Sequence, residues 1–142
     1  MSKLEKKIQH REFVQNIITR MNANSFQIKS LTITIISAFL AIYATTTKEL
    51  FLIIPIPIVV LFWFLDTYYL QQERKFKGIY NDITGLNNNP ITTNTYQISP
   101  NLYIGKEYNY WNAFSSKTLF PFYLLIIVFL LFSYFIIEFN VF

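Results

Sequence analysis

The sequence contains no cysteine, a single histidine and only three glycines in 142 residues. The absence of cysteine excludes disulfides, thiolate nucleophiles and cysteine-bound metal ions. With His10 as the only histidine, one chain cannot build a two-histidine metal site or a histidine-based catalytic relay. The three glycines are isolated and form no phosphate-cradling loop. We therefore expect no enzymatic activity and no cofactor.

Charge is also scarce, because only 14% of the residues are charged while 53% are hydrophobic and 19% are aromatic. A soluble domain usually carries nearer a quarter charged residues. A soluble domain this short could not bury so much apolar surface in one core. The apolar residues also fall into three blocks rather than spreading evenly. This composition indicates an integral membrane protein.

We predict an all-α membrane protein with three transmembrane helices. The second continues into a cytoplasmic amphipathic helix, and an N-terminal cytoplasmic helix precedes the first. The predicted organisation has four parts: a cytoplasmic amphipathic helix (1–25), a transmembrane hairpin (26–66), a cytoplasmic helix with a loop and an interfacial segment (67–117), and a third transmembrane helix (118–142).

The N-terminal segment carries apolar residues at helical spacing over positions 1–24, opposite a basic face. Asn24 and Ser25 are residues that commonly cap a helix, so we expect a new helix to begin there. The first span is placed at about Ser30–Thr46, and at 1.5 Å per residue it is about 26 Å long. Lys29 can snorkel to the membrane interface and extend the fit.

The second span runs from about Leu50 to Leu65 and contains Pro55 and Pro57. Each proline lacks an N–H group and disfavours helical geometry in the residue before it. We therefore expect an irregular start to this span, with a kinked helix as the alternative. No breaker follows, so the helix is predicted to continue to about Ile83.

The remainder comprises a loop over 85–101, an interfacial segment over 105–115 and a third span over 119–137 that carries no charge. Ser115 or Ser116 is expected to cap this span, and Pro121 suits its first turn. Amphipathic aromatic rings favour the membrane boundary, which we assign to Tyr103, Tyr108, Tyr110 and Trp111.

Basic residues set the expected orientation in a bacterial inner membrane. Six precede the first span and five lie between the second and third spans, whereas the first turn has only Lys48. The positive-inside rule therefore places the N-terminus and residues 66–117 in the cytoplasm and the C-terminus outside.

Small and mildly polar residues form one stripe along the first span, at Ser30, Thr34, Ser37, Ala41 and Thr45. Small residues and hydroxyls are common where membrane helices pack closely. They would equally suit a water-lined pore wall formed by several copies of the chain. Both interpretations remain open at this point.

Charged residues gather at the inner end of the second span. Asp66 is either an interface anchor or one member of a carboxylate ring at a pore mouth, which would favour cations. The residues that follow form either a solvated helix face or contacts for an acidic partner or nucleotide. These candidates are Glu73, Arg74, Lys75 and Lys77, with Arg20 as a contributor from the N-terminal helix.

Three segments carry a family resemblance: Phe13–Ala38 (FVQNIITRMNANSFQIKSLTITIISA), Leu65–Ile83 (LDTYYLQQERKFKGIYNDI) and, more weakly, Ser115–Tyr123 (SSKTLFPFY). They resemble a family of small bacterial membrane proteins similar to the channel effectors of nucleotidyltransferase-associated anti-phage systems such as Hailong. The positions that match are Arg20, Asn24, Ser25, Asp66, Tyr69, Glu73, Arg74, Phe76 and Tyr80. The chain departs from the family in having Ser30 and Leu31 where glycine and tryptophan are expected.

The resemblance implies a homo-oligomeric ion channel held silent or opened by a nucleotidyltransferase-like enzyme or its nucleotide product. Three spans are too few to enclose a pore, so conduction requires a closed ring of copies, for which we expect a tetramer. Pro55 and Pro57 are the expected gating element. The alternatives are a non-conducting anchor that docks a cytoplasmic partner, and a membrane-disrupting toxin without a defined pore.

Overall fold

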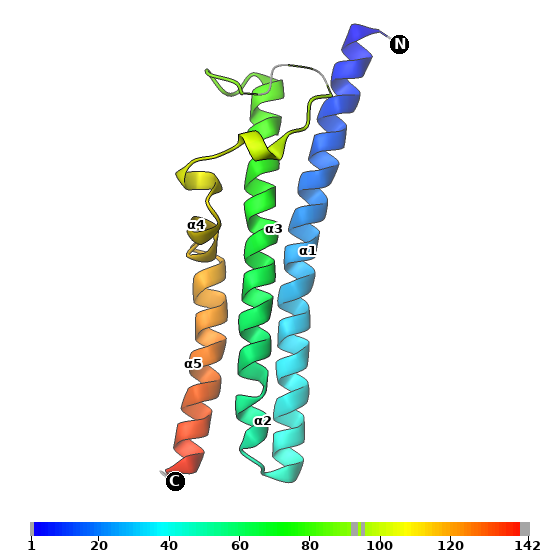
Figure 1. The fold of residues 1–142 in the computed structure, drawn as a ribbon. Helices are drawn as coiled ribbons and strands as arrows, with labels where there is room; N and C mark the ends of the chain where they lie inside the picture. Colours follow the sequence, from blue (N-terminus) through cyan, green and yellow to red (C-terminus); the bar gives the residue numbers. More distant parts are fainter. Residues whose placement is uncertain (1, 92–93, 95, 140–142) are drawn as a thin grey trace. The chain divides into compact units, whose positions relative to one another are not determined.

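The computed structural model describes residues 2–91, 94 and 96–139, and these residues form helices connected by turns and loops (Figure 1). The elements are α1 (Lys3–Thr46), α2 (Leu50–Ile53), α3 (Pro55–Thr84), the 3₁₀ turns η1 (Pro100–Leu102) and η2 (Lys106–Tyr108), α4 (Tyr110–Phe114) and α5 (Leu119–Glu138). No β-strand occurs in the described part of the chain, which confirms the all-helical class. Residue 1 and residues 140–142 of the predicted terminal segments lie outside that part.

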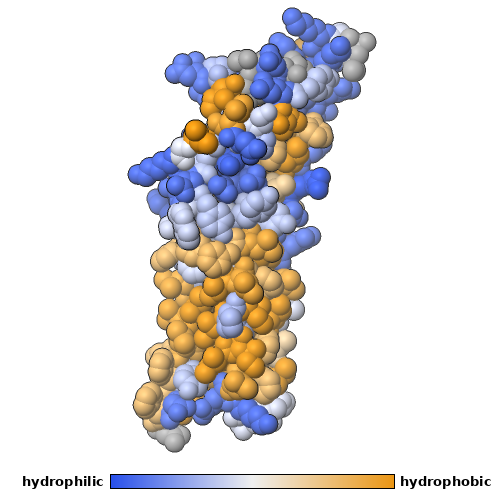
Figure 2. Space-filling view, in the orientation of Figure 1, coloured by the Kyte–Doolittle hydropathy of each residue, from blue (hydrophilic) through white to orange (hydrophobic). Residues whose placement is uncertain are grey.

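Three helical stretches are long and apolar enough to cross a membrane, and they correspond to α1, to α2 with α3, and to α5. Figure 2 shows a broad apolar surface over the helices that carry these stretches. The protein is therefore membrane-embedded, as the composition indicates.

The chain divides into two compact units. We call them the polar unit, formed by 1–25 with 68–113, and the membrane unit, formed by 26–67 with 114–142. Both α1 and α3 contribute one part to each unit. In the membrane unit, α1, α3 and α5 lie side by side (Figure 1), and α2 packs against α5.

Helix α1 is continuous for 44 residues, so the predicted helix boundary at Asn24 and Ser25 is wrong. The physical reason is the absence of any glycine or proline between Lys3 and Thr46, because cap residues permit a boundary without imposing one. Ser25 instead lies buried along the helix. The helix ends before Thr47, which adopts a positive φ of 54°.

The two prolines mark the junction between α2 and α3, where the helical assignment is interrupted at Ile54. Pro55 is the first residue of α3 and Pro57 lies in its first turn, where a missing N–H removes no helical hydrogen bond. Ile54 nevertheless keeps α-helical angles and donates its N–H to the Leu50 carbonyl at 3.0 Å. The expectation that Pro55 displaces Ile54 from helical geometry is therefore wrong.

Helix α3 ends one residue beyond the predicted Ile83, in a Schellman motif. The N–H of Gly85 bonds the Asp82 carbonyl at 3.3 Å, and the N–H of Leu86 bonds the Asn81 carbonyl at 2.9 Å. Gly85 adopts a φ of +78°, which glycine reaches without a Cβ penalty. The described residues of the loop predicted over 85–101 are irregular until η1 begins at Pro100. Three residues of the predicted loop lie outside the described part.

Helix α5 matches the predicted third span and extends it by one residue. The hydroxyl of Ser116, one of the two predicted caps, accepts a hydrogen bond from the N–H of Leu119 at 3.2 Å. The interfacial segment predicted over 105–115 contains the separate short elements η2 and α4.

Candidate functional site

A buried ionic cluster joins the three long helices inside the membrane unit. The Nζ atom of Lys29 on α1 lies 2.6 Å from Oδ2 of Asp66 on α3. The hydroxyl of Tyr123 on α5 donates a hydrogen bond to the same oxygen at 2.8 Å. Asp66 is fully buried, while the Lys29 side chain keeps 24% exposure. Charge inside a membrane protein is costly unless it is paired, so the cluster stabilises the burial of the Asp66 carboxylate.

Helical periodicity explains why these side chains meet. Val59, Trp63 and Asp66 follow 4,3 spacing and are all buried on one face of α3. Trp63 stacks on Phe114 with ring centroids 4.2 Å apart and on Tyr123 at 5.8 Å. Its Nε1–H also donates to the Phe114 carbonyl at 3.3 Å. An aromatic stack therefore adjoins the carboxylate.

The burial of Asp66 argues against one of its two predicted roles, the member of a carboxylate ring at a pore mouth. A carboxylate ring requires side chains that reach the outer surface of each protomer, whereas Asp66 has no exposed surface. Its Oδ2 is engaged by Lys29 and Tyr123 of the same chain. We therefore assign Asp66 to the internal structure of the membrane unit.

The other pore-lining candidates lie together on the outer surface of α1. Ser30, Thr34, Ser37 and Ala41 are all exposed, as is Thr45. The packed face of the helix carries Ile28, Thr32 and Ile36, about half a turn away around the axis. We call the exposed set, 30, 34, 37, 41 and 45, the hydroxyl stripe.

Hydrogen bonding makes the hydroxyl stripe mildly polar. The Thr34 hydroxyl donates to the Ser30 carbonyl at 2.9 Å, and the Thr45 hydroxyl donates to the Ile42 carbonyl at 2.9 Å. The hydroxyl donors of Thr34 and Thr45 are thus satisfied within α1, while their oxygen lone pairs stay available on the surface. The stripe can therefore accept hydrogen bonds from water or from a neighbouring helix.

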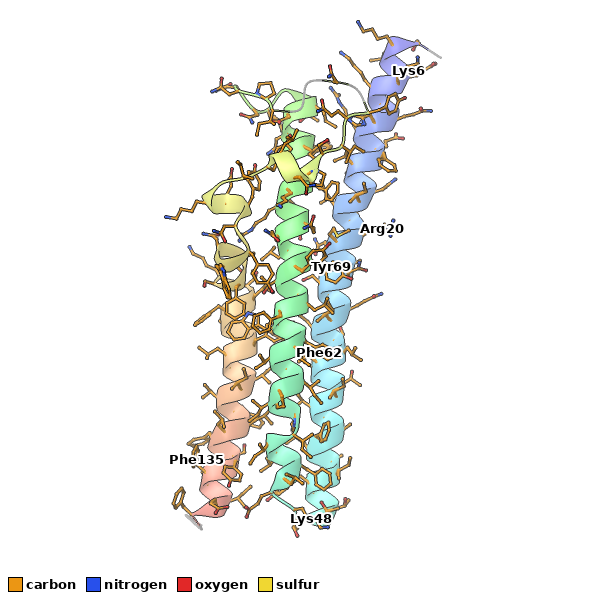
Figure 3. All side chains as sticks on the ribbon, viewed as in Figure 1. Lys6, Arg20, Lys48, Phe62, Tyr69 and Phe135 are labelled. Carbon is orange, nitrogen blue, oxygen red and sulfur yellow. The ribbon has the colours of Figure 1, made fainter. Side chains whose placement is uncertain are left out.

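Helix α5 presents a different outer surface. Leu125, Phe132 and Phe135 are 70%, 63% and 51% exposed, and Figure 3 shows Phe135 directed outward from α5. Large apolar side chains suit contact with lipid, whereas small and hydroxyl side chains suit contact between helices or with water. The hydroxyl stripe thus differs in chemistry from this surface of α5, while Leu31, Ile33 and Ile42 beside the stripe are exposed apolar side chains of α1.

The polar unit contains a cavity of about 370 Å³ that includes two of the predicted ligand-binding residues, Arg74 and Lys77. The other lining residues are Gly78, Asn81, Glu107, Tyr108 and Asn112. Nη1 of Arg74 donates to the Glu107 carbonyl at 3.2 Å and to Oδ1 of Asn112 at 2.8 Å. These contacts hold the guanidinium at the cavity wall.

The other predicted ligand-binding residues lie apart from this wall. Glu73 is buried and forms an ion pair with Lys77 at 2.5 Å, which positions the ammonium group. Lys75 is half-buried, and Arg20 is exposed on α1; neither lines the cavity. The structure thus brings Arg74 and Lys77 together, with Glu73 as a positioning partner.

Gly78 allows two tyrosines to pack directly against α3. A Cβ atom at Gly78 would lie 2.7 Å from both Cδ1 of Tyr103 and the hydroxyl oxygen of Tyr108. Tyr103 is 1% exposed and donates its hydroxyl hydrogen to Oδ2 of Asp82 at 2.5 Å. Burial raises the pKa of Tyr108, and the neighbouring Glu107 carboxylate adds to this rise.

Tyr103, one of the aromatic residues assigned to the membrane boundary, is thus packed inside the polar unit. Sequence reasoning also missed Asp82, which accepts hydrogen bonds from Asn87 Nδ2 at 2.7 Å and from the N–H of Ile91 at 2.9 Å. The available signal was Gly78, the only glycine within α3, because a glycine inside a helix often permits close approach of another segment.

The described residues contain no group of three or more His, Asp or Glu side chains that could hold a metal ion. Comparisons of the whole chain with protein-family models, curated proteins and solved structures find no match.

Proposed function

We propose that this protein is the ion-conducting subunit of a homo-oligomer, a tetramer, in a bacterial inner membrane. The observation that carries the proposal is the exposed hydroxyl stripe on α1, which lies opposite the packed face of the same helix. One protomer with three spans cannot enclose a pore, so the stripes of several copies would surround the axis. Their lone pairs would replace part of the hydration of a passing ion.

The contrast between α1 and α5 supports this arrangement. In such a ring the hydroxyl stripe would face the water of the pore, and the large apolar side chains of α5 would face lipid. The buried Lys29–Asp66 pair supports the same arrangement, since it keeps α1 fixed to α3. The lining of the proposed pore is Ser30, Thr34, Ser37, Ala41 and Thr45, without Asp66.

We further propose that the channel is a membrane-depolarising effector of an anti-phage defence system. The support is the sequence resemblance over 13–38 and 65–83, together with the cavity in the polar unit. Arg74 and Lys77 would attract an anionic nucleotide signal or an acidic surface of a nucleotidyltransferase-like partner. Binding there would hold the channel closed or open it.

Cysteine accessibility tests the pore directly, because the natural chain has no cysteine. Purified Thr34→Cys and Ser37→Cys proteins would be recorded in planar bilayers before and after addition of a charged, membrane-impermeant thiol reagent. We expect discrete currents that the reagent blocks. Leu125→Cys, on the outer surface of α5, is the matched control and should remain unaffected.

Three other results would point elsewhere. Equal block of the α5 control would move the pore away from α1. Leakage of large dyes along with ions would indicate membrane disruption without a defined pore. An absence of current in every condition, with a stable complex between the chain and a partner, would favour a non-conducting anchor.

A further inference from the structure

The segment from η1 to α4 has one side packed on α3 and another side exposed. Tyr103 is 1% exposed and Tyr108 is half-buried, and both lie against Gly78. By contrast, Leu102, Ile104 and Trp111 are 45%, 82% and 64% exposed. Three large apolar side chains within ten residues therefore project outward while their aromatic neighbours pack inward.

Chain connectivity keeps this segment close to the bilayer. Trp111 is eight residues before Leu119, the first residue of the membrane-spanning helix α5. Eight residues reach at most about 29 Å even when fully extended, and α4 shortens this distance. Trp111 therefore remains within reach of the headgroup layer, and Ile104 lies seven residues before Trp111 in the same segment.

The chemistry of the segment fits that layer. Tryptophan favours the membrane interface because its ring is apolar while its indole N–H remains hydrogen-bonded. Trp111 is flanked in the sequence by Tyr110 and Asn112, whose hydroxyl and amide groups are polar. Within 102–113 the only charges are Lys106 and Glu107, which sum to zero. Attraction by anionic lipids is therefore a minor contribution.

We propose that the exposed side of this segment binds the phospholipid surface, with Trp111 and Ile104 inserted among the headgroups. The segment would then anchor the loop of the polar unit to the membrane next to α5. This inference is independent of ion conduction, because it requires only a bilayer and one protomer.

Tryptophan fluorescence tests the proposal, because the chain has only Trp63 and Trp111. The Trp63→Phe protein would be placed in phosphatidylcholine nanodiscs with lipids brominated near the glycerol end or near the chain terminus. We expect shallow bromines to reduce Trp111 emission about twofold and deep bromines to act more weakly. Replacing half of the lipid with phosphatidylglycerol should not change this result.

The Trp63→Phe substitution removes a ring that stacks on Phe114 and Tyr123. A second measurement therefore leaves Trp63 in place. Ile104→Cys would carry a nitroxide in the otherwise natural chain, with the exposed loop variant Asn89→Cys as the matched control. We expect oxygen, which concentrates in lipid, to relax the label at 104 more than the label at 89. A water-soluble nickel chelate should show the opposite order.

Four outcomes would overturn the proposal. Quenching of Trp111 by aqueous iodide, with no effect of brominated lipid, would place the segment in water. A blue-shifted Trp111 emission that neither iodide nor brominated lipid changes would show that another protein surface, such as that of a second copy, covers Trp111. A requirement for anionic lipid would indicate a headgroup-charge site instead. Equal relaxation of the two nitroxides by oxygen would exclude lipid contact at Ile104.

Discussion

Lys29 and Asp66 form an ion pair with Nζ and Oδ2 2.6 Å apart, although 37 residues separate them in the sequence. The two partners are not equivalent, because Asp66 is fully buried while the Lys29 side chain is 24% exposed. Tyr123 adds a hydrogen bond to the same carboxylate oxygen. Each of the three long helices of the membrane unit thus contributes one group to this contact.

We expect Lys29→Met to destabilise the protein more than Asp66→Asn. Removing the lysine leaves a carboxylate with no exposed surface, whereas removing the carboxylate leaves an ammonium group that is 24% exposed and can extend toward the membrane interface. Breaking a buried pair costs about 3–5 kcal/mol, so the lysine variant should approach this value. Reversible unfolding in detergent micelles gives the free energies of both variants.

The double variant Lys29→Met with Asp66→Leu is the control for this prediction. Replacing both charges with apolar groups should recover most of the lost stability. A double variant as unstable as the sum of the two single variants would show that the pair is not coupled.

We expect Gly78→Ala to destabilise the polar unit by about 1–3 kcal/mol, because the added Cβ overpacks the contact with Tyr103 and Tyr108. Combining it with Tyr108→Phe should recover part of the loss, since that change removes one of the two closest atoms. Hydrogen exchange of amides in 68–84 measures the effect. Wild-type protection in the single variant would contradict the packing described for Gly78.

Acid should weaken the polar unit through His10. The ring is 3% exposed, its two nitrogens have no hydrogen-bond partner among the described residues, and burial lowers its pKa from the usual 6.5. The folded protein therefore binds the proton more weakly than the unfolded chain. Stability is complete above about pH 6.5 and falls as the pH decreases from there toward the lowered folded pKa.

Thermal unfolding at about pH 7.5 and about pH 5.5 measures this dependence. His10→Phe keeps an aromatic ring next to Tyr96, whose centroid lies 5.5 Å from that of His10, and it should lose part of the acid sensitivity. Identical pH dependence in the variant and the natural chain would assign the sensitivity to other groups.

Pro55→Ala with Pro57→Ala should change the gating of the proposed channel. Alanine restores two N–H donors and favours one continuous helix in place of the junction between α2 and α3. A stiffer segment is expected to alter the open probability in single-channel recordings. Pro121→Ala, in the first turn of α5, is the matched control. Unchanged conductance and regulation in the double variant would exclude the prolines as the gating element.

The sequence by itself determined the helical class and the presence of three helical stretches apolar enough to cross a membrane. Long apolar blocks leave little choice in a bilayer, where backbone groups must bond within their own helix. The predicted C-terminal ends of α5 and of α3 therefore each lie one residue before the ends in the structure. The continuity of α1 escaped prediction because Asn24 and Ser25 are compatible with both a helix boundary and a helix interior.

Only the tertiary structure decided which helix faces meet. Periodicity shows that the hydroxyl stripe shares one face of α1, but packing of Ile28, Thr32 and Ile36 decides that this face points outward. The same limit applies to Asp66 and Tyr103, whose burial depends on Lys29, Tyr123, Gly78 and Asp82, all distant in the sequence. A local pattern encodes the spacing of side chains along one helix, whereas their partners are selected by close packing between helices.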